Sequence, residues 1–406
     1  MLFAGAFAYF ASVLQRSSMG SATLVAADRF HIGAAALSTL GVSQLAVYAA
    51  MQIPVGMLLE RFGPKRLLIF GASFTALGNL LVAFSGVFVF AVAGRMAVGF
   101  GDAFIFVSMI KLLNNWVIGP RATRLTQVLS NVGQLGQIAS AFPFAFLLQT
   151  EGWTTAFLAA TSFSLVAIAL VFYLVTDSPN PHSQHNPVKM RLIAQLRENL
   201  ADPVTRKAFW AHFSLQSSGS VFILFWGVPF LERGEGLTRN QASWLLTAFV
   251  CIGFIVGPIL ANFCAKHPER RFLIVLMIWS LIVGAWLMVI LTPGVNPLWQ
   301  LLLLLLAMGT GGPASMVAFD YSRVGIPLRR LGSSNGIINS GGFVATFSML
   351  FLIGLALDAI KGLSATNDQY SLAGFKLAFC VQFIVLSFGL TMFFIERKKT
   401  QRRAAI

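Results

Sequence analysis

Arg16, Arg95 and Asp102 are charged residues that lie deep inside long apolar stretches of the sequence. A charged side chain near the centre of a bilayer costs about 2.5–3.5 kcal/mol on insertion scales, so we expect none of them to face lipid. A guanidinium group binds carboxylates and similar anions through paired hydrogen bonds, and a carboxylate can accept a proton or bind an amine. These residue types predict a polar passage that binds a carboxylate-bearing anion or a zwitterion.

The elements that must position these residues are long apolar helices. The chain of 406 residues is 57% apolar and 11% charged, whereas a soluble protein is about one-quarter charged, so a water-soluble fold is excluded. One membrane crossing takes roughly 20 apolar residues, and the sequence has twelve such runs. They are residues 3–27, 34–59, 66–86, 88–112, 125–149, 154–176, 208–230, 241–265, 272–292, 298–320, 332–357 and 373–395. We predict an all-α membrane protein, and we expect the first run to be retained as a helix rather than removed as a signal.

The basic residues indicate how the chain is oriented. If the N-terminus is cytoplasmic, 21 of the 29 Lys and Arg residues fall in cytoplasmic segments and five on the other side. Positive charge favours the cytoplasmic face, so both termini are expected there. This explains the net charge of +15 without nucleic acid as a partner. The sequence has no N-x-Ser/Thr acceptor site, and we expect a multi-pass protein of a bacterial cytoplasmic membrane.

A polar segment divides the apolar runs into two sets of six. We predict an N-terminal bundle over 1–176, a cytoplasmic linker over 177–207 and a C-terminal bundle with a basic tail over 208–406. Apolar residues recur at helical spacing from Lys189 to Leu200, which predicts an amphipathic helix on the cytoplasmic membrane face. Two six-helix halves are typical of secondary transporters built from repeats.

The loop between the second and third runs carries a recognisable pattern. It reads Gly56-Met-Leu-Leu-Glu60-Arg61-Phe-Gly63-Pro64-Lys65-Arg66. This resembles the loop signature of the major facilitator superfamily, with Glu in the acidic position. We expect Gly56 to let a neighbouring helix approach and Gly63 to make a tight turn. The resemblance implies that Glu60 meets the start of the eleventh helix, near Gly332, as a latch; the alternative is that the loop only anchors the topology.

The fourth run carries a second resemblance to the same superfamily, Arg95-x-x-x-Gly99-x-Gly101-Asp102. The two resemblances together cover essentially the whole chain. They imply twelve membrane helices in two six-helix bundles, which alternate access to a central site. The overall pattern is most similar to the peptide- and organic-acid-carrying branches, including the lysosomal dipeptide transporter group.

In this superfamily the first, fourth, seventh and tenth helices line the cavity, so Arg16 and Asp102 are expected to reach the transport path. For Arg16 we favour substrate binding over a purely structural ion pair. For Asp102 there are two alternatives. It either takes up a coupled proton or a substrate amine, or it pairs with Arg16 or Arg95. Arg95 is expected to be structural or coupling-related rather than a direct ligand.

Amide and phenol side chains extend this polar lining along other helices. Each could instead bond helix to helix, for under about 2 kcal/mol. The candidates for substrate contact are Gln44, Tyr48, Gln134, Gln216 and Asn339.

Signatures of other chemistry are missing from the sequence. The cysteines have no C-x-x-C spacing, and neither a phosphate-binding loop nor a zinc-binding His-Glu-x-x-His occurs. The Gly332–Gly336 segment fits Gly-x-Ser-x-Gly, but a nucleophile elbow needs a preceding strand and partners that this helix lacks. We therefore expect no enzyme, no cofactor and no metal.

The predicted function is secondary active transport of a small polar solute by a monomer in the lipid bilayer, with protons as a candidate coupling ion. The alternatives are a multidrug or other efflux permease of the same superfamily, a membrane-embedded lipid enzyme and a transporter-like sensor.

Overall fold

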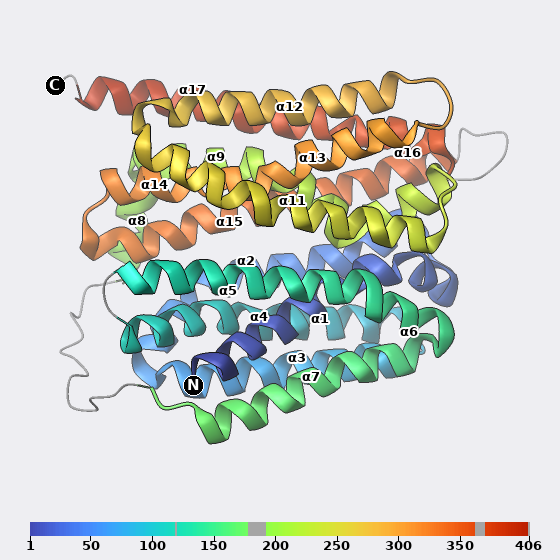
Figure 1. Ribbon diagram of the computed structural model, residues 1–406, viewed down its shortest axis with the longest axis horizontal. Helices are drawn as coiled ribbons and strands as arrows, with labels where there is room; N and C mark the ends of the chain where they lie inside the picture. The colour runs from blue at the N-terminus through green and yellow to red at the C-terminus, as the bar shows by residue number, and fades with distance from the viewer. Residues whose placement is uncertain (118–119, 178–191, 362–369, 405–406) are drawn as a thin grey trace. The chain divides into compact units, whose positions relative to one another are not determined.

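The computed structural model describes residues 1–117, 120–177, 192–361 and 370–404. Within those ranges every regular element is a helix (Figure 1), which confirms the predicted all-α class. The described residues form two compact units. The first unit holds 1–31 and 43–177, and the second holds 32–42 and 192–404. The helix α2 (Ala34–Phe62) therefore contributes residues to both units.

The helices follow the apolar runs of the sequence closely. Besides α2, the first unit contains α1 (Leu2–Phe30), α3 (Pro64–Phe84), α4 (Phe88–Trp116), α5 (Pro120–Ala139), η1 (Ser140–Phe144), α6 (Ala145–Thr150) and α7 (Gly152–Leu174). The second contains α8 (Leu192–Ala201), α9 (Pro203–Val221), η3 (Phe222–Trp226), α10 (Gly227–Pro229), η4 (Phe230–Gly234), α11 (Arg239–Lys266), η5 (Pro268–Arg270), α12 (Arg271–Leu291), α13 (Leu298–Ser315), α14 (Val317–Gly325), α15 (Leu328–Lys361), α16 (Leu372–Phe379) and α17 (Val381–Ala404).

Ten of the helical segments in the described ranges are long and apolar enough to cross a membrane by length and composition. Two further segments, α1 and the stretch from α5 to α6, fall outside that set although each spans about 30 residues. Both carry many polar side chains, which lowers their hydropathy; α1 alone holds Ser12, Gln15 and Arg16. With these two, the helices match the twelve runs predicted from the sequence.

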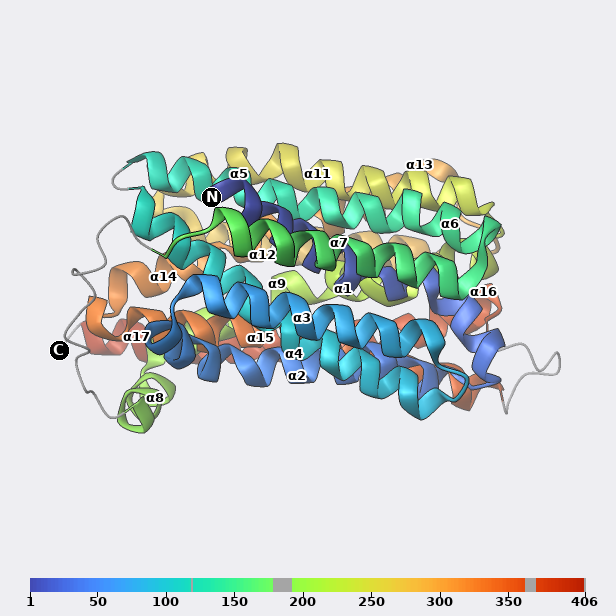
Figure 2. The same cartoon turned by 90° about the horizontal axis from the view of Figure 1, so that it is seen from below.

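The same scheme of contacts recurs in each unit. In the first, α1 packs against α4, α5 and α7, and α3 packs against α4 and α7 (Figure 2). In the second, α9 packs against α13, α15 and α17, and α12 packs against α13. Each unit is therefore organised around its own first long helix, as expected of a repeat.

Small residues set the distance between α3 and α4. A Cβ atom added to Gly71 would lie 2.6 Å from the carbonyl oxygen of Gly101, and one added to Gly78 would lie 2.5 Å from that of Gly94. Backbones approach this closely only where neither side chain intervenes. This packing holds α4, which carries Arg95 and Asp102, firmly against α3.

Within the described ranges, three π-helical turns interrupt the α-helical pattern, at Ser140–Phe144, Phe222–Trp226 and Phe230–Gly234. Such turns insert one extra residue and leave backbone groups without their usual partners. In the first of them the carbonyl of Ser140 accepts a hydrogen bond of 2.9 Å from the hydroxyl of Ser21 on α1. A polar side chain of a neighbouring helix thus supplies a hydrogen-bond donor to a backbone carbonyl at the π-helical turn.

Candidate functional site

An ion pair between α1 and α4 forms the centre of the first unit's polar cluster. Nη1 of Arg16 lies 3.2 Å from Oδ2 of Asp102. Oδ1 of the same carboxylate accepts a hydrogen bond from the hydroxyl of Ser12, one helical turn before Arg16. The side chain of Asp102 is 2% exposed and that of Arg16 is 13% exposed. The guanidinium group is therefore the part of the pair that an outside molecule can reach.

Aromatic rings surround the guanidinium group of Arg16. The ring of Tyr48, from α2, has its centroid 5.6 Å from Cζ of Arg16, a distance at which a cation is attracted to an aromatic face. Tyr9 lies two turns before Arg16 on α1 and also interacts with it electrostatically. Sequence reasoning selected Tyr48 but missed Tyr9, although Tyr9, Ser12 and Arg16 share one helix face through their i, i+3 and i+7 spacing.

Arg95 of α4 forms hydrogen bonds to α1 and α2 and takes no part in the ion pair between Arg16 and Asp102. Its Nη2 donates to Oε1 of Gln44 on α2 and, at 3.0 Å, to the carbonyl of Arg16. Its Nη1 donates to the carbonyl of Gln15 at 3.2 Å. The side chain is nearly fully buried. These contacts hold the backbone of α1 at the residue whose side chain binds Asp102, and Gln44 serves as a partner of Arg95.

Gly99 allows α2 and α4 to come close enough for the contact between Gln44 and Arg95. A Cβ atom added to Gly99 would lie 2.2 Å from the backbone oxygen of Gln44. By contrast, a Cβ atom added to Gly56 would meet nothing within 4 Å. No close helix approach is formed at Gly56 among the described residues, and the approach expected there stays a prediction.

Gln15 links α1 to α7 on the other side of the helix. Its Nε2 donates to the carbonyl of Ala160 at 2.9 Å and to the hydroxyl of Ser164 at 2.5 Å. Ser164 is in turn 3.1 Å from the hydroxyl of Thr75 on α3. This chain of hydrogen bonds fixes the rotation of α1 about its own axis, and with it the direction in which Arg16 points.

The remaining candidates for substrate contact lie on three other helices. Gln134 is partly buried on α5 of the first unit, and its neighbour Gly136 packs against the backbone of α1 at Phe10. Gln216 on α9 and Asn339 on α15 are partly buried in the second unit. A role in substrate contact stays a prediction for all three.

The second unit has a polar cluster whose contacts were not predicted from the sequence. His212 of α9 is fully buried, with Nδ1 3.3 Å from the carbonyl of Ser315. Ser218, also on α9, donates to Oε1 of Gln382 at 2.6 Å and accepts from Nε1 of Trp286 at 3.0 Å. The serine and its partners lie 68 or more positions apart in sequence, so no local spacing could have identified them.

The loop after α2 is built as a tight turn, as predicted. Gly63 has φ +76° and precedes Pro64 at the first position of α3. Oδ1 of Asp177 accepts a 2.6 Å hydrogen bond from the backbone nitrogen of Lys65, so a carboxylate caps the N-terminus of α3. Sequence reasoning missed Asp177, which lies 112 residues further along the chain.

The other charged residues of this loop are less constrained. Arg61 lies over the ring of Phe62, at 5.2 Å, and Arg66 is exposed. The side chain of Glu60 lies outside the described residues. The predicted contact of Glu60 with the start of the eleventh helix therefore stays a prediction.

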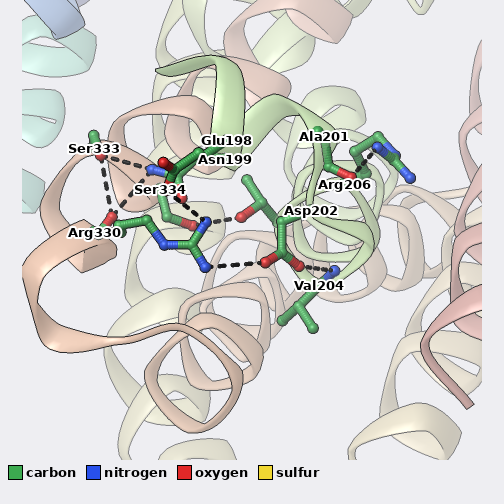
Figure 3. Close-up of polar contacts among 10 residues, drawn as sticks. Glu198, Asn199, Ala201, Asp202, Val204, Arg206, Arg330, Ser333 and Ser334 are labelled. Atoms are coloured by element: carbon green, nitrogen blue, oxygen red, sulfur yellow. Dashed lines mark hydrogen bonds and ion pairs between the residues drawn. The ribbon is translucent and has the colours of Figure 1, made fainter. Parts of the chain in front are cut away.

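The start of the eleventh helix, α15, is contacted by α8 (Figure 3). Arg330 lies 3.3 Å from Asp202 and 3.6 Å from Glu198. Asn199 is buried and donates to the hydroxyl of Ser333 at 2.6 Å. The predicted helix of the linker thus exists over Leu192–Ala201, and one face of it is polar and packs against α15.

This geometry defines a class: a multi-pass helical membrane protein of two similar units, with an ion pair held between the long helices of the first. The sequence model described as Major Facilitator Superfamily matches residues 5–349. The chain belongs to the Major Facilitator Superfamily, which confirms the family expected from the two motifs and agrees with the expectation of a transporter rather than an enzyme.

Curated relatives of this chain are transporters by name. It is 21% identical over 274 residues to the probable sulfoacetate transporter SauU of Cupriavidus necator, covering 65% of this chain and 64% of that protein. It is 21% identical over 254 residues to the probable galactarate/D-glucarate transporter GudP of Escherichia coli, covering 55% and 56%. The chain thus spans less than two thirds of the length of either relative.

A solved structure has the same fold. It is the crystal structure of a bacterial homolog to the human lysosomal transporter Spinster, in an inward-facing and unoccupied conformation. The TM-score is 0.76, with 14% identity over 98% of this chain and 96% of that one. At this identity the likeness establishes the fold alone, which is the twelve-helix fold predicted from the sequence.

Proposed function

We propose that the protein is a secondary active transporter of small organic anions, working as a monomer by alternating access in a bacterial cytoplasmic membrane with both termini inside. The observation that carries this proposal is the ion pair between Arg16 and Asp102. Two charges are held 3.2 Å apart at membrane depth, and only the cation is partly exposed. A buried pair contributes little net stability over an apolar replacement, so a functional role explains its presence better than a structural one.

The ion pair suggests how an anion and a proton could be coupled. A substrate carboxylate or sulfonate that approaches Arg16 competes with the carboxylate of Asp102. Protonation of Asp102 removes its negative charge, which frees the guanidinium group for the substrate. The proton cancels the charge of the Asp102 carboxylate, and one anionic group of the substrate takes its place beside Arg16, so the charge next to the guanidinium group is unchanged. The pair therefore supports symport of an anion with a proton.

The names of the relatives support an anionic substrate. Sulfoacetate carries a sulfonate and a carboxylate, and galactarate and glucarate carry two carboxylates each; these are the substrates in the names of SauU and GudP. Every one of these groups matches the planar donor fork of an arginine. We therefore choose sulfoacetate and D-glucarate as the first transport probes for this chain.

We further propose roles for the other candidate residues. Tyr48 orients Arg16 through its ring, at 5.6 Å, and Gln134, Gln216 and Asn339 contact the polar part of the substrate. Arg95, Gly99 and Gln44 position α1 and α2 around the site. The loop from Gly56 to Arg66, with Glu60 as its acidic member, controls the conformational change.

Replacement of Arg16 tests the substrate role. We expect Arg16→Gln to lower uptake of a transported probe by proteoliposomes at least 100-fold, because the cation that attracts the anion is lost. Lys111→Gln is the matched control, since it removes one cation from α4 away from the cluster and should leave uptake unchanged. Uptake by a folded Arg16→Gln protein at the wild-type rate would contradict the proposal.

Replacement of Asp102 tests the proton role separately. We expect Asp102→Asn, which mimics the protonated carboxyl, to abolish uptake driven by a pH gradient while exchange of internal for external substrate continues. The measurement compares gradient-driven uptake with counterflow in the same proteoliposomes. A variant that still accumulates substrate when the gradient is imposed would exclude Asp102 as the proton carrier.

A further inference from the structure

The second unit has a cavity of about 250 Å³ at the end where α17 reaches its last turns. The starts of α9 and α12, the η5 turn, α14 and α17 all contribute to its wall. Three of the lining residues are cations: Lys207, Arg271 and Arg397. They come from three different helices, so the fold, and not local sequence, brings their charges together.

Aromatic rings hold two of these cations in place. Nζ of Lys207 lies 4.0 Å from the ring centroid of Tyr321, and Cζ of Arg397 lies 3.6 Å from that of Phe272. In the described part of the chain, neither cation has an ion pair or a side-chain hydrogen bond. Both cations are thus oriented without being neutralised.

The third cation, Arg271, is only weakly paired. Its Nε lies 4.0 Å from Oδ2 of Asp320, and that carboxylate is also 3.2 Å from Nη1 of Arg323. The Nε atom is buried and has no hydrogen-bond acceptor among the described residues. Asp320 therefore neutralises Arg271 only in part, and the rest of this guanidinium group contributes positive charge to the cavity wall.

The nearby acidic groups are engaged elsewhere. Glu269 lines the cavity, but its side chain is 64% exposed and lies near His267 and Arg270, at 3.5 and 3.7 Å. Glu396 is paired with Arg206 at 3.0 Å and with Lys399 at 2.7 Å. The lining therefore keeps an excess of positive charge around a cavity with room for a small anion.

The shape and the donors of this cavity indicate the ligand. Ligand pockets for drug-sized molecules run from roughly 300 to 1,000 Å³, so a cavity of about 250 Å³ suits a small group. The guanidinium groups of Arg271 and Arg397 offer forked donors, Lys207 offers a point charge, and Gln401 adds an amide donor. Phosphate, with several oxygens and one or two negative charges, matches such a set.

We propose that this cavity binds a phosphate group, carried either by free phosphate or by the headgroup of an anionic lipid. The cavity lies in the second unit, whereas Arg16 and Asp102 lie in the first, so this inference is independent of the proposed transport function. A phosphate bound there offsets the mutual repulsion of three cations on separate helices. Its binding therefore ties α9, α12 and α17 together.

Thermal unfolding of the full-length purified protein tests this proposal in two arms. In the first, sodium phosphate is titrated in detergent against sodium chloride at matched ionic strength. In the second, the protein is compared in nanodiscs of dioleoylphosphatidylglycerol and of dioleoylphosphatidylcholine. A saturable rise of the unfolding midpoint in phosphate identifies the free anion, and a rise confined to the phosphatidylglycerol nanodiscs identifies the lipid headgroup. No rise in either arm overturns the proposal.

Variants connect the effect to this cavity. We expect Lys207→Gln combined with Arg397→Gln to weaken the apparent affinity for the active probe at least 10-fold, whereas Lys398→Gln, an exposed neighbour outside the lining, leaves it unchanged. Without anion the double variant should unfold at or above the wild-type midpoint, because repulsion is relieved. Thr400→Asp places a carboxylate at the cavity and should also abolish the response. A wild-type response in a folded double variant, or in Thr400→Asp, overturns the assignment.

Discussion

Arg95 shows how a buried cation can be held by neutral groups alone. Its three hydrogen bonds go to two backbone carbonyls of α1 and one amide of α2. No carboxylate lies within 4 Å of it in the described ranges. Carbonyl dipoles offset part of the cost of removing the charge from water, and Asp102 remains available to Arg16. The two arginines of the cluster therefore have separate tasks, although both are cations on the packed pair of helices α1 and α4.

Replacement of Arg95 by lysine is expected to destabilise the protein although the charge is kept. A single ammonium group cannot reach all three acceptors of the guanidinium fork, and loss of the bond to Oε1 of Gln44 leaves that buried acceptor unpaired, at a cost of about 1–3 kcal/mol. The unfolding midpoint of Arg95→Lys in detergent should fall below that of the wild type by several degrees. Lys111→Arg is the control. An unchanged midpoint for Arg95→Lys would show that its hydrogen bonds do not fasten α1.

At the scale of elements, the approach of α2 to α4 depends on one glycine. The backbone oxygen of Gln44 occupies the space that a side chain at Gly99 would need. The two helices can therefore lie close together only while this position has no Cβ atom. The same approach brings the amide of Gln44 to Arg95, so packing and hydrogen bonding at this site are coupled.

Substitution of alanine at two glycines should have opposite effects. Gly99→Ala places a Cβ atom 2.2 Å from a backbone oxygen, and overpacking of this kind costs about 1–3 kcal/mol. Gly56→Ala meets no atom within 4 Å and should stabilise α2 by up to about 1 kcal/mol, because glycine is a poor helix former. Thermal unfolding of both variants checks this. Equal midpoints for the two would refute the packing role of Gly99.

The sequence predicts those parts of the fold and of the candidate site that depend on residues close together in the chain. The helices follow from runs of apolar residues, and the inward direction of Arg16 and Asp102 follows from the cost of a charge in lipid. The capping of α3 by Asp177 and the bond between Ser218 and Gln382 could not be predicted, because their partners lie 112 and 164 residues away. The neighbour of Gly56 could not be predicted for the same reason, since a glycine permits a close approach without supplying the neighbour.

For the whole molecule, both halves use one arrangement of helices around different polar groups. The first half holds an arginine and an aspartate on α1 and α4, whereas α9 of the second carries His212 and Ser218. The fold therefore does not dictate the chemistry of its lining. The chemistry of each half therefore has to be argued from its own residues and not from the shared arrangement of helices.

The orientation in the membrane is the prediction that belongs to this scale. In a background without Cys251, Cys264 and Cys380, we expect a cysteine at Lys398 to react with a membrane-impermeant maleimide only from the cytoplasmic side, and one at Glu151 only from the opposite side. Both positions are exposed. Labelling of right-side-out and inverted vesicles measures this. The reverse pattern would invert the topology, and reaction of both from one side would contradict the span count.

The π-helical turns have a consequence for how such a chain can vary. Each adds a single residue to a helix, and one residue corresponds to a rotation of about 100° around the axis. A π-turn absorbs one extra residue locally, so loss of one residue from Phe222–Trp226 would restore regular winding while the later side chains of that segment keep their headings. Related chains could therefore gain or lose a single codon at such a turn without turning the later side chains away from their cargo, whereas a codon gained in regular helix would rotate all of them by about 100°.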